Sequence, residues 1–326
     1  MSSSPNTVDT DRLDALALWL QSIGENPATL RPVSSDASAR RYFRLDSLAG
    51  TRVAVDAPPD TEDNATFLAV ASELRAAGIR VPAQHAAQLE GGFLLMEDFG
   101  DTPFETALTD ETLQLHYDQA IDLLAALHHL PTHHRQRYAP ELITRELGIF
   151  IDHYLTDQGV TLSESDRAAW NRYTQWTLAA FDAGEAVWTH RDFHCRNLML
   201  LTDGSLGLID FQGALHAPAG YDLASLLRDC YVDLPPAAFT RALDRYASAM
   251  GIADAGALRQ SVDILGLQRH LKCLGLFVRF AREQGKRQYL AALPRTAAYA
   301  RHVASSYPES DIVLSLLNRC QREPPL

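Results

Sequence analysis

The chain has 326 residues, 46% hydrophobic and 21% charged, which is ordinary for a globular protein. Its 41 acidic against 29 basic residues give a formal net charge of -12, which disfavours nucleic acid as a partner. A polar N-terminus, no long apolar run and isolated cysteines indicate a cytoplasmic protein without a secretion signal, membrane span or disulfide framework.

The first third of the chain is predicted to be rich in strands. Apolar residues at helical spacing predict a short helix that ends at Gly24. Short alternating apolar runs over 33–56 and 92–97 predict antiparallel strands. Between them, one apolar stripe over 61–77 predicts a second helix. Turn residues then follow, so a boundary near residue 100 is expected.

The remainder of the chain has mainly helical patterns. Apolar stripes at 113–127 and 142–155 predict helices, and strand patterns return only at 187–211. The sequence therefore predicts an α+β protein with two lobes. Residues 1–100 would form a small antiparallel-sheet lobe with one helix, preceded by the short helix, and residues 101–326 would form a larger helical lobe. A ligand is expected between lobes.

An Asp-Gly pair between two apolar runs at 187–212 predicts a β-hairpin. If Asp203 and Gly204 are the two loop residues, Asn197 lies opposite Asp210 with both side chains on one face. Directly opposed residues hold their Cβ atoms about 4.5–5.5 Å apart. An amide oxygen and a carboxylate at that spacing suit one hard cation, so Asn197 and Asp210 are predicted Mg²⁺ ligands.

Asp192 precedes Asn197 in the loop that enters this hairpin. The sequence His190-Arg191-Asp192 followed by Asn197 fits the catalytic loop of kinases. In that template the aspartate orients the acceptor hydroxyl and takes its proton, while the asparagine and a later aspartate hold metal ions. The competing interpretation is an ordinary hairpin with turn and capping residues. The agreement of loop spacing, hairpin and downstream aspartate favours the kinase.

The run His-Arg-Asp-Phe-His-Cys-Arg-Asn, followed by Leu-Ile-Asp-Phe-Gln, resembles the catalytic and metal motifs of aminoglycoside phosphotransferase-like kinases. The resemblance implies a two-lobed, protein-kinase-like fold that uses ATP and Mg²⁺. It extends to Leu95-Met-Glu-Asp-Phe-Gly100 as an adenine-binding hinge, so Glu97 and Phe99 would contact adenine. It also implies that Asp222 braces the catalytic loop.

The phosphate-binding lysine of protein kinases has no counterpart in the expected place. The third strand reads Arg-Val-Ala-Val-Asp, with Asp56 where the lysine would stand. Arg40, Arg41 or Arg44 would supply the missing charge, and Arg44 alternates with Tyr42 on the presumed second strand. A solvated surface role is the competing interpretation for each arginine.

The glycine-rich loop of protein kinases is also absent. Its place is taken by a Ser-Ser-Asp-Ala-Ser run, whose hydroxyls and backbone N–H groups would cradle phosphates in a turn. The predicted nucleotide ligands in this loop are Ser35, Asp36 and Ser38.

A narrower resemblance rests on three further segments. The Ser-Asp-Ala-Ser run with Arg-Tyr-Phe-Arg, the Asp-Ala-Pro-Pro run that begins at Asp56, and the run from Gln268 to Phe277 resemble anomeric amino-sugar kinases. Those enzymes phosphorylate N-acetylmuramate and N-acetylglucosamine at C1. The resemblance implies an amino-sugar substrate and a role in bacterial cell-wall recycling.

Five residues are candidates for binding the sugar. Arg228, Arg269 and Lys272 lie near motif segments in the sequence and would face the carboxylate of an acidic sugar, although a surface position competes for each. Glu146 and Tyr154 lie on a predicted helix and would bond sugar hydroxyls, although an aromatic residue at helical spacing is more often in the core.

Two other functions remain open. The same chemistry would serve an aminoglycoside, choline or another small alcohol as acceptor. Without the strand lysine, the chain would alternatively be a nucleotide-binding pseudokinase. The intact set of Asp192, Asn197 and Asp210 argues against the pseudokinase.

Overall fold

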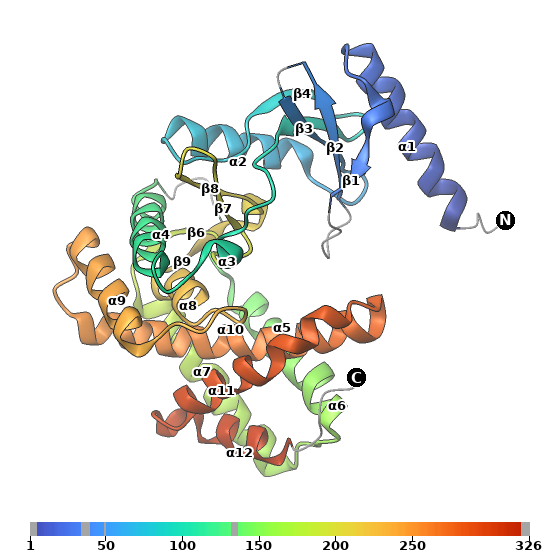
Figure 1. Cartoon of the computed structure of the whole chain (residues 1–326). Coiled ribbons are helices and arrows are strands. Elements are labelled where there is room, and N and C mark those ends of the chain that lie inside the picture. Colours follow the sequence, from blue (N-terminus) through green and yellow to red (C-terminus); the bar gives the residue numbers. More distant parts are fainter. Residues whose placement is uncertain (1–4, 34–39, 49, 132–135, 321–326) are drawn as a thin grey trace. The chain divides into compact units, whose positions relative to one another are not determined.

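The chain folds into two compact units in a computed structural model (Figure 1). The structure describes residues 5–33, 40–48, 50–131 and 136–320. The first unit consists of residues 1–102 together with 199–212, and the second of residues 103–198 together with 213–326. The boundary near residue 102 lies close to the one expected from the turn residues. The segment 199–212, which the sequence assigned to the second lobe, belongs to the first unit.

The first unit contains a five-stranded antiparallel sheet in the order β1-β2-β3-β5-β4. Its strands are β1 (Arg31–Pro32), β2 (Arg41–Ser47), β3 (Gly50–Asp56), β4 (Gln84–Gln88) and β5 (Phe93–Glu97). Arg41 lies opposite Asp56 across β2 and β3, and Ala54 lies opposite Leu95 across β3 and β5. The antiparallel strands expected in this part of the chain are therefore confirmed.

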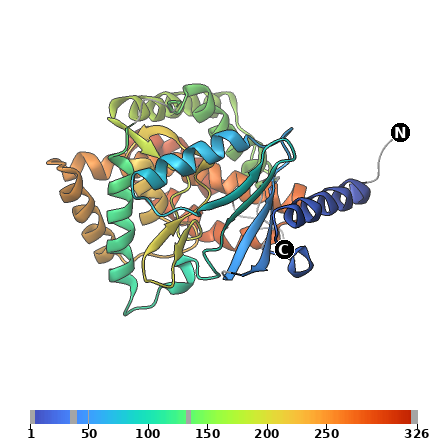
Figure 2. The same cartoon turned by 90° about the horizontal axis from the view of Figure 1, so that it is seen from above.

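Two helices flank this sheet, α1 (Pro5–Ser22) and α2 (Asn64–Ala76). They lie on opposite sides of the strands, as Figures 1 and 2 both show. The core between α1 and the sheet contains Leu16, Trp19 and Leu20 of the helix and these sheet residues: Phe43, Leu45, Ala54, Phe93 and Leu95. Because side chains alternate along a strand, Phe43 and Leu45 face α1, and their neighbour Arg44 faces the other side.

A hairpin of β7 (Leu198–Leu200) and β8 (Leu206–Leu208) joins the first unit. The backbone N–H of Leu200 donates to the carbonyl of Thr102 at 2.8 Å, and that of Leu208 donates to the carbonyl of Arg80 at 2.8 Å. These two bonds attach the hairpin to the chain of the first unit, although its sequence lies between segments of the second.

The hairpin turn differs from the predicted two-residue turn. The N–H of Leu201 donates to the carbonyl of Ser205, and the N–H of Gly204 donates to the carbonyl of Leu201, both at 2.9 Å. Gly204 has φ +81, as in a three-residue loop that ends in a glycine bulge. The register is therefore shifted by one residue, and the predicted pairing of Asn197 opposite Asp210 is wrong.

The second unit is mainly helical and contains one further strand pair, β6 (Ala186–Thr189) with β9 (Leu215–Pro218). Its α-helices are α3 (Phe104–Ala107), α4 (Leu113–His128), α5 (Pro140–Ile149), α6 (Thr156–Gln158), α7 (Glu164–Ala183), α8 (Gly220–Leu227), α9 (Pro236–Met250), α10 (Ala255–Gln284), α11 (Leu293–Ala304) and α12 (Asp311–Arg319). Short 3-10 turns occur at η1 (Pro27–Thr29), η3 (Phe211–Gly213), η4 (Arg287–Ala292) and η5 (Pro308–Ser310).

Helix α10 forms the centre of the second unit (Figure 1). It packs against the end of α5 so closely that a Cβ at Gly275 would lie 2.3 Å from the carbonyl oxygen of Ile149, which only glycine permits. The helix predicted over 142–155 is interrupted there, because η2 (Phe150–Leu155) is a π-helical turn. No helix in the described part of the chain is long and apolar enough to cross a bilayer.

Candidate active site

The loop after β6 is held by a buried carboxylate of α8. Asp222 accepts hydrogen bonds from the backbone N–H of His190 at 2.6 Å and of Arg191 at 2.9 Å. Arg191 has φ 76, a conformation that costs free energy for any residue other than glycine. The two bonds to Asp222 compensate for that cost. They also fix the backbone immediately before Asp192.

Asn197 closes the same loop onto Asp192. The carbonyl of Asp192 accepts hydrogen bonds from the N–H of His194 at 3.0 Å and from Nδ2 of Asn197 at 2.9 Å. Because Nδ2 is used in this bond, the amide of Asn197 is fixed with its oxygen directed elsewhere. That oxygen is a hard ligand atom, of the kind that Mg²⁺ prefers.

Two buried cations of α10 lie around the carboxylate of Asp192. Nη2 of Arg269 is 3.8 Å from Oδ1 of Asp192, and the Asp192 side chain is 42% exposed. Burial would raise the pKa of Asp192, but the charges of Lys272 and Arg269 outweigh it and lower that pKa below its ordinary value. Asp192 is therefore ionised at neutral pH, with its carboxylate open to a ligand.

The surface positions considered for Arg269 and Lys272 are wrong, because both side chains are buried. Burial favours the neutral amine of Lys272, but Glu146 and Asp192 raise its pKa above the ordinary value. Nζ of Lys272 also donates to the hydroxyl of Tyr221 at 3.1 Å. Lys272 is thus a charged group inside the protein.

Glu146 supplies the balancing negative charge. Its carboxylate accepts hydrogen bonds from Nη2 of Arg191 at 2.8 Å, from Nε2 of Gln268 at 3.0 Å, and from the hydroxyl of Tyr138. Burial opposes its ionisation, yet Lys272 and Arg191 lower the pKa of Glu146. Glu146 therefore links α5, the catalytic loop and α10 into one charged network.

The structure does not bring all five candidate sugar ligands together. Tyr154 is in the core, where its ring stacks on Phe150 with centroids 5.5 Å apart. Arg228 is buried rather than on the surface, and it pairs with Asp263. In the described part of the chain, the groups around Asp192 come from α5, α8 and α10 instead.

Sequence reasoning missed three members of this network, namely Tyr138, Tyr221 and Gln268. Gln268 and Lys272 are four residues apart in α10 and so share one face of the helix, which is a signal that the sequence contains. Tyr138 and Tyr221 bond through their hydroxyls at 3.2 Å. Their sequence separation gives no comparable signal.

Asp210 lies in the first unit, two residues after the end of β8. It has φ 61, and its Oδ1 accepts a hydrogen bond from Nε2 of Gln212 at 2.7 Å. The carboxylate of Asp210 in the first unit and the amide oxygen of Asn197 in the second are each ligand atoms of the kind that Mg²⁺ prefers. No group of three or more His, Cys, Asp or Glu side chains able to hold a metal occurs among the described residues. Mg²⁺ commonly uses one or two protein ligands, with nucleotide phosphates and water completing its shell.

The expected adenine hinge, in the first unit, is organised around Arg80. Nη1 of Arg80 donates to the carboxylate of Glu97 at 2.7 Å, which lowers the pKa of Glu97. The Arg80 guanidinium also lies 5.0 Å from the ring centroid of Phe99. A Cβ at Gly207 would be 2.4 Å from that ring, so the Phe99 ring packs between Arg80 and β8.

Arg44, a predicted nucleotide ligand, is engaged by two carboxylates of the same unit. Its Nε lies 2.6 Å from Asp98, and its Nη1 lies 2.6 Å from Asp101. The cluster of one guanidinium and two carboxylates has a net negative charge, so it does not attract phosphate. The other predicted phosphate ligands, Ser35, Asp36 and Ser38, lie outside the described residues.

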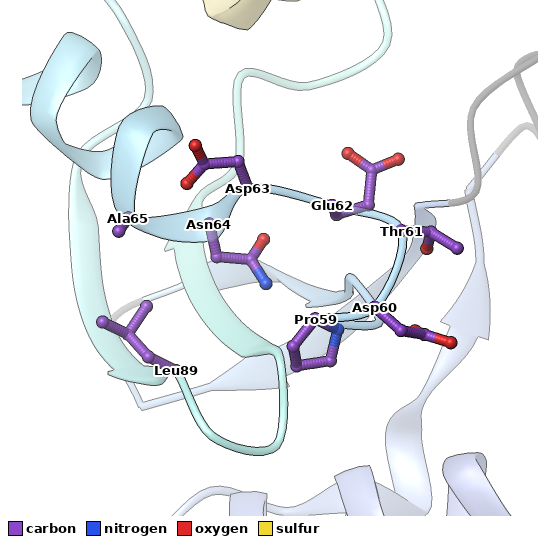
Figure 3. Close-up of a pocket in the computed structure, with 8 residues that line it drawn as sticks. All are labelled: Pro59, Asp60, Thr61, Glu62, Asp63, Asn64, Ala65 and Leu89. Carbon is purple, nitrogen blue, oxygen red and sulfur yellow. The ribbon is translucent and has the colours of Figure 1, made fainter.

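A pocket of about 410 Å³ in the first unit is formed by residues 59–65 and Leu89, as Figure 3 shows. Asp60, Glu62 and Asp63 line it, but their carboxylates point in different directions and do not converge on one point. Asp63 caps α2 instead, accepting from the N–H of Thr66 at 2.9 Å. The catalytic loop is therefore the better candidate for the site of chemistry.

Residues 29–260 match a model of the phosphotransferase enzyme family. The chain belongs to this family. The phosphotransferase is 36% identical over 326 aligned residues to an N-acetylmuramate/N-acetylglucosamine kinase from Pseudomonas aeruginosa, with 92% of this chain and 94% of that protein covered. A protein of the same name from Pseudomonas putida is 35% identical over 317 residues, covering 91% and 93%.

Solved structures share the fold of the phosphotransferase. A choline kinase from Streptococcus pneumoniae gives a TM-score of 0.63 at 15% identity, covering 90% of this chain and 99% of that one. An ADP-bound aminoglycoside phosphotransferase, APH(2'')-Ib, gives 0.58 at 14% identity, covering 90% and 99%. The predicted α+β, kinase-like fold is thereby confirmed.

Proposed function

We propose that this phosphotransferase uses ATP to phosphorylate the anomeric hydroxyl of N-acetylmuramate and N-acetylglucosamine. The observation that carries the proposal is the Asp192 carboxylate, which is partly exposed, ionised and fixed by the catalytic loop. The names of the relatives from two Pseudomonas species support the choice of acceptor. Because ATP is the donor, we place the reaction in the cytoplasm.

Asp192 would orient the acceptor in this reaction. Its carboxylate accepts a hydrogen bond from the anomeric hydroxyl, whose oxygen attacks the γ-phosphorus of ATP. A new oxygen–phosphorus bond forms, the bond from the γ-phosphorus to the bridging oxygen breaks, and ADP leaves with that electron pair. The hydroxyl proton passes to Asp192. A weakly basic carboxylate suits this acceptor, because an anomeric hydroxyl is more acidic than an ordinary alcohol.

We assign nucleotide binding to the first unit and acceptor binding to the second. Asn197 and Asp210 would hold Mg²⁺, which when bound neutralises charge on the phosphoryl group in transfer. Glu97 and Phe99 remain the proposed hinge contacts with adenine. An aminoglycoside, choline or another small alcohol is the alternative acceptor, and a pseudokinase is the alternative without catalysis.

In the second unit, Arg269 and Lys272 have two proposed roles. They keep Asp192 ionised, and they provide positive charge for the carboxylate of N-acetylmuramate. Glu146 supports them from the opposite side through Arg191 and Gln268. A hydrogen-bonded carboxylate with this many partners is already satisfied, so we assign Glu146 to positioning rather than to direct sugar contact.

Lys272→Met is expected to move the acid limb of the kcat/KM profile to higher pH. The substitution removes a positive charge near Asp192, so the pKa of that carboxyl rises toward its ordinary value and protonation begins at a higher pH. Rates measured with N-acetylglucosamine from about pH 3 upward, a range that includes the ordinary pKa of an aspartate, test it. Lys286→Met, at a half-buried position in the loop after α10, is the matched control. An unchanged acid limb in Lys272→Met would contradict the electrostatic role.

We expect ADP release with N-acetylglucosamine and with N-acetylmuramate. We expect no ADP release with their 1-O-methyl glycosides. The methyl group removes the hydroxyl that Asp192 orients and leaves the rest of the sugar intact. The panel also includes choline and an aminoglycoside. Transfer only to these two would establish the alternative acceptor class. ATP binding without transfer to any acceptor would establish the pseudokinase.

A further inference from the structure

We infer that Arg40 is the nucleotide-phosphate ligand that replaces the missing strand lysine. The inference deepens the proposed function and rests on it, since it assigns a role in ATP binding. It concerns residues of the first unit alone. Three arginines lie close together in the sequence at the start of β2, namely Arg40, Arg41 and Arg44. Their side chains have different surroundings.

Asp56 does not occupy the place of a phosphate-binding residue. Its buried carboxylate accepts from Nε of Arg12 on α1 at 2.9 Å, and from Nε of Arg41 at 2.9 Å. Arg41 lies directly opposite Asp56 in the sheet, so their side chains share the face that α1 covers. The comparison of Asp56 with the kinase lysine is therefore wrong. Asp56 joins α1 to the sheet, and Arg41 is part of the same junction.

Arg40 packs on α2, the helix on the other side of the sheet from α1 (Figures 1 and 2). Its guanidinium is 4.6 Å from the ring centroid of Phe67 on α2. Its Nη2 lies 3.2 Å from the carboxylate of Glu62, two residues before the first residue of α2. In protein kinases the phosphate-binding lysine likewise pairs with a glutamate of the helix beside the sheet. Arg40 and Glu62 form a similar ion pair, with the cation just before β2 and the glutamate just before α2.

A stack of aromatic side chains, Phe67 on Phe211, connects Arg40 with the segment that contains Asp210. The ring of Phe67 stacks on Phe211 with centroids 5.0 Å apart, and Phe211 follows the proposed metal ligand Asp210 directly. The phosphates must lie beside the Mg²⁺ that they share with the protein. Arg40 contacts Phe67, and Phe67 contacts Phe211, the residue after Asp210. The guanidinium of Arg40 therefore suits the β- and γ-phosphates of the nucleotide.

The surroundings of Arg40 differ from those of its neighbours. Arg44 lies 2.6 Å from each of two carboxylates, and Arg41 is bound to Asp56 on the α1 side, whereas Arg40 lies 3.2 Å from the carboxylate of Glu62 and acts electrostatically on that of Asp63. The Arg40 side chain is 1% exposed, so packing fixes its direction before a nucleotide arrives. Such preorganisation reduces the entropy cost of binding. A guanidinium also binds phosphate through two parallel hydrogen bonds.

Calorimetric titration of the full chain with ATP plus Mg²⁺, and with adenosine, tests this role without any acceptor. We expect Arg40→Met to weaken ATP binding by at least about tenfold, since a charge-assisted contact is lost, and to leave adenosine binding unchanged. Arg40→Lys should restore part of the ATP affinity. The matched control is Arg52→Met, which removes another sheet arginine paired with a glutamate, Glu25, and should bind ATP like the wild type.

The outcomes separate the two proposals. If Arg40→Met binds ATP as tightly as the wild type, or loses ATP and adenosine to the same extent, Arg40 is not a phosphate ligand. Retained adenosine affinity also shows that the variant is folded. If the wild type binds ATP but phosphorylates no amino sugar, the proposed acceptor is wrong while the Arg40 result stands. A wild-type chain that does not bind ATP overturns both.

Discussion

Asp192→Asn is expected to lower kcat by at least about a thousandfold, because the base that orients the acceptor contributes roughly that much. ATP affinity should stay within about twofold, since Asp192 faces the acceptor and not the nucleotide. The substitution keeps the size of the side chain and removes its charge. Single-turnover transfer to N-acetylglucosamine and calorimetric ATP binding, measured on the same preparation, check both parts.

Asp244→Asn is the control for this substitution. Asp244 is exposed on α9, so its replacement changes net charge by the same amount without touching the catalytic loop. A kcat for Asp192→Asn within about tenfold of the wild type would rule out Asp192 as the group that takes the hydroxyl proton. Loss of both turnover and ATP binding would instead indicate that the variant is misfolded, which thermal unfolding detects.

Asp222→Asn is expected to lower the free energy of unfolding by about 3 kcal/mol. This cost combines one buried N–H donor left without a partner and the loss of hydrogen bonds to a charged carboxylate. The amide nitrogen cannot accept from a backbone N–H, so either His190 or Arg191 loses its partner. Urea unfolding measures the loss. We also expect a lower kcat with an almost unchanged KM for ATP, because the loop that carries Asp192 is no longer fixed.

A second buried carboxylate separates positioning from general stability. Asp157 is buried in the second unit and pairs with Arg282, so Asp157→Asn should also destabilise the chain. Its kcat should equal that of the wild type at a temperature where both are folded. If Asp222→Asn likewise kept full kcat under those conditions, Asp222 would have a purely structural role.

The sequence predicted the features that depend on local pattern. The order of helices and strands follows from apolar spacing, and the kinase motif follows from short fixed intervals between Asp192, Asn197 and Asp210. The hairpin register was not predictable in the same way. An Asp-Gly pair suits a two-residue turn and also a three-residue loop with Gly204 in the left-handed region. The choice between these two turns shifts every residue pair between β7 and β8 by one position.

Tertiary packing decided the features that the sequence left open. Arg269 and Lys272 looked like surface residues because charged side chains are rarely buried without partners. Their partners, Glu146 and Asp192, lie more than seventy residues earlier in the chain. Similarly, which face of the sheet Asp56 occupies depends on the packing of α1, which no strand pattern reveals.

The attachment of the hairpin to the first unit has a consequence for synthesis on the ribosome. Leu200 and Leu208 bond to Thr102 and Arg80, and about a hundred residues of the second unit are made between those partners and the hairpin. Until the hairpin emerges, the carbonyls of Thr102 and Arg80 lack these hydrogen bonds. Domains that fold during translation usually complete themselves in order from the N-terminus. Here the hairpin is synthesised only after residues 103–198, so the first unit cannot be completed before that part of the second unit has been made.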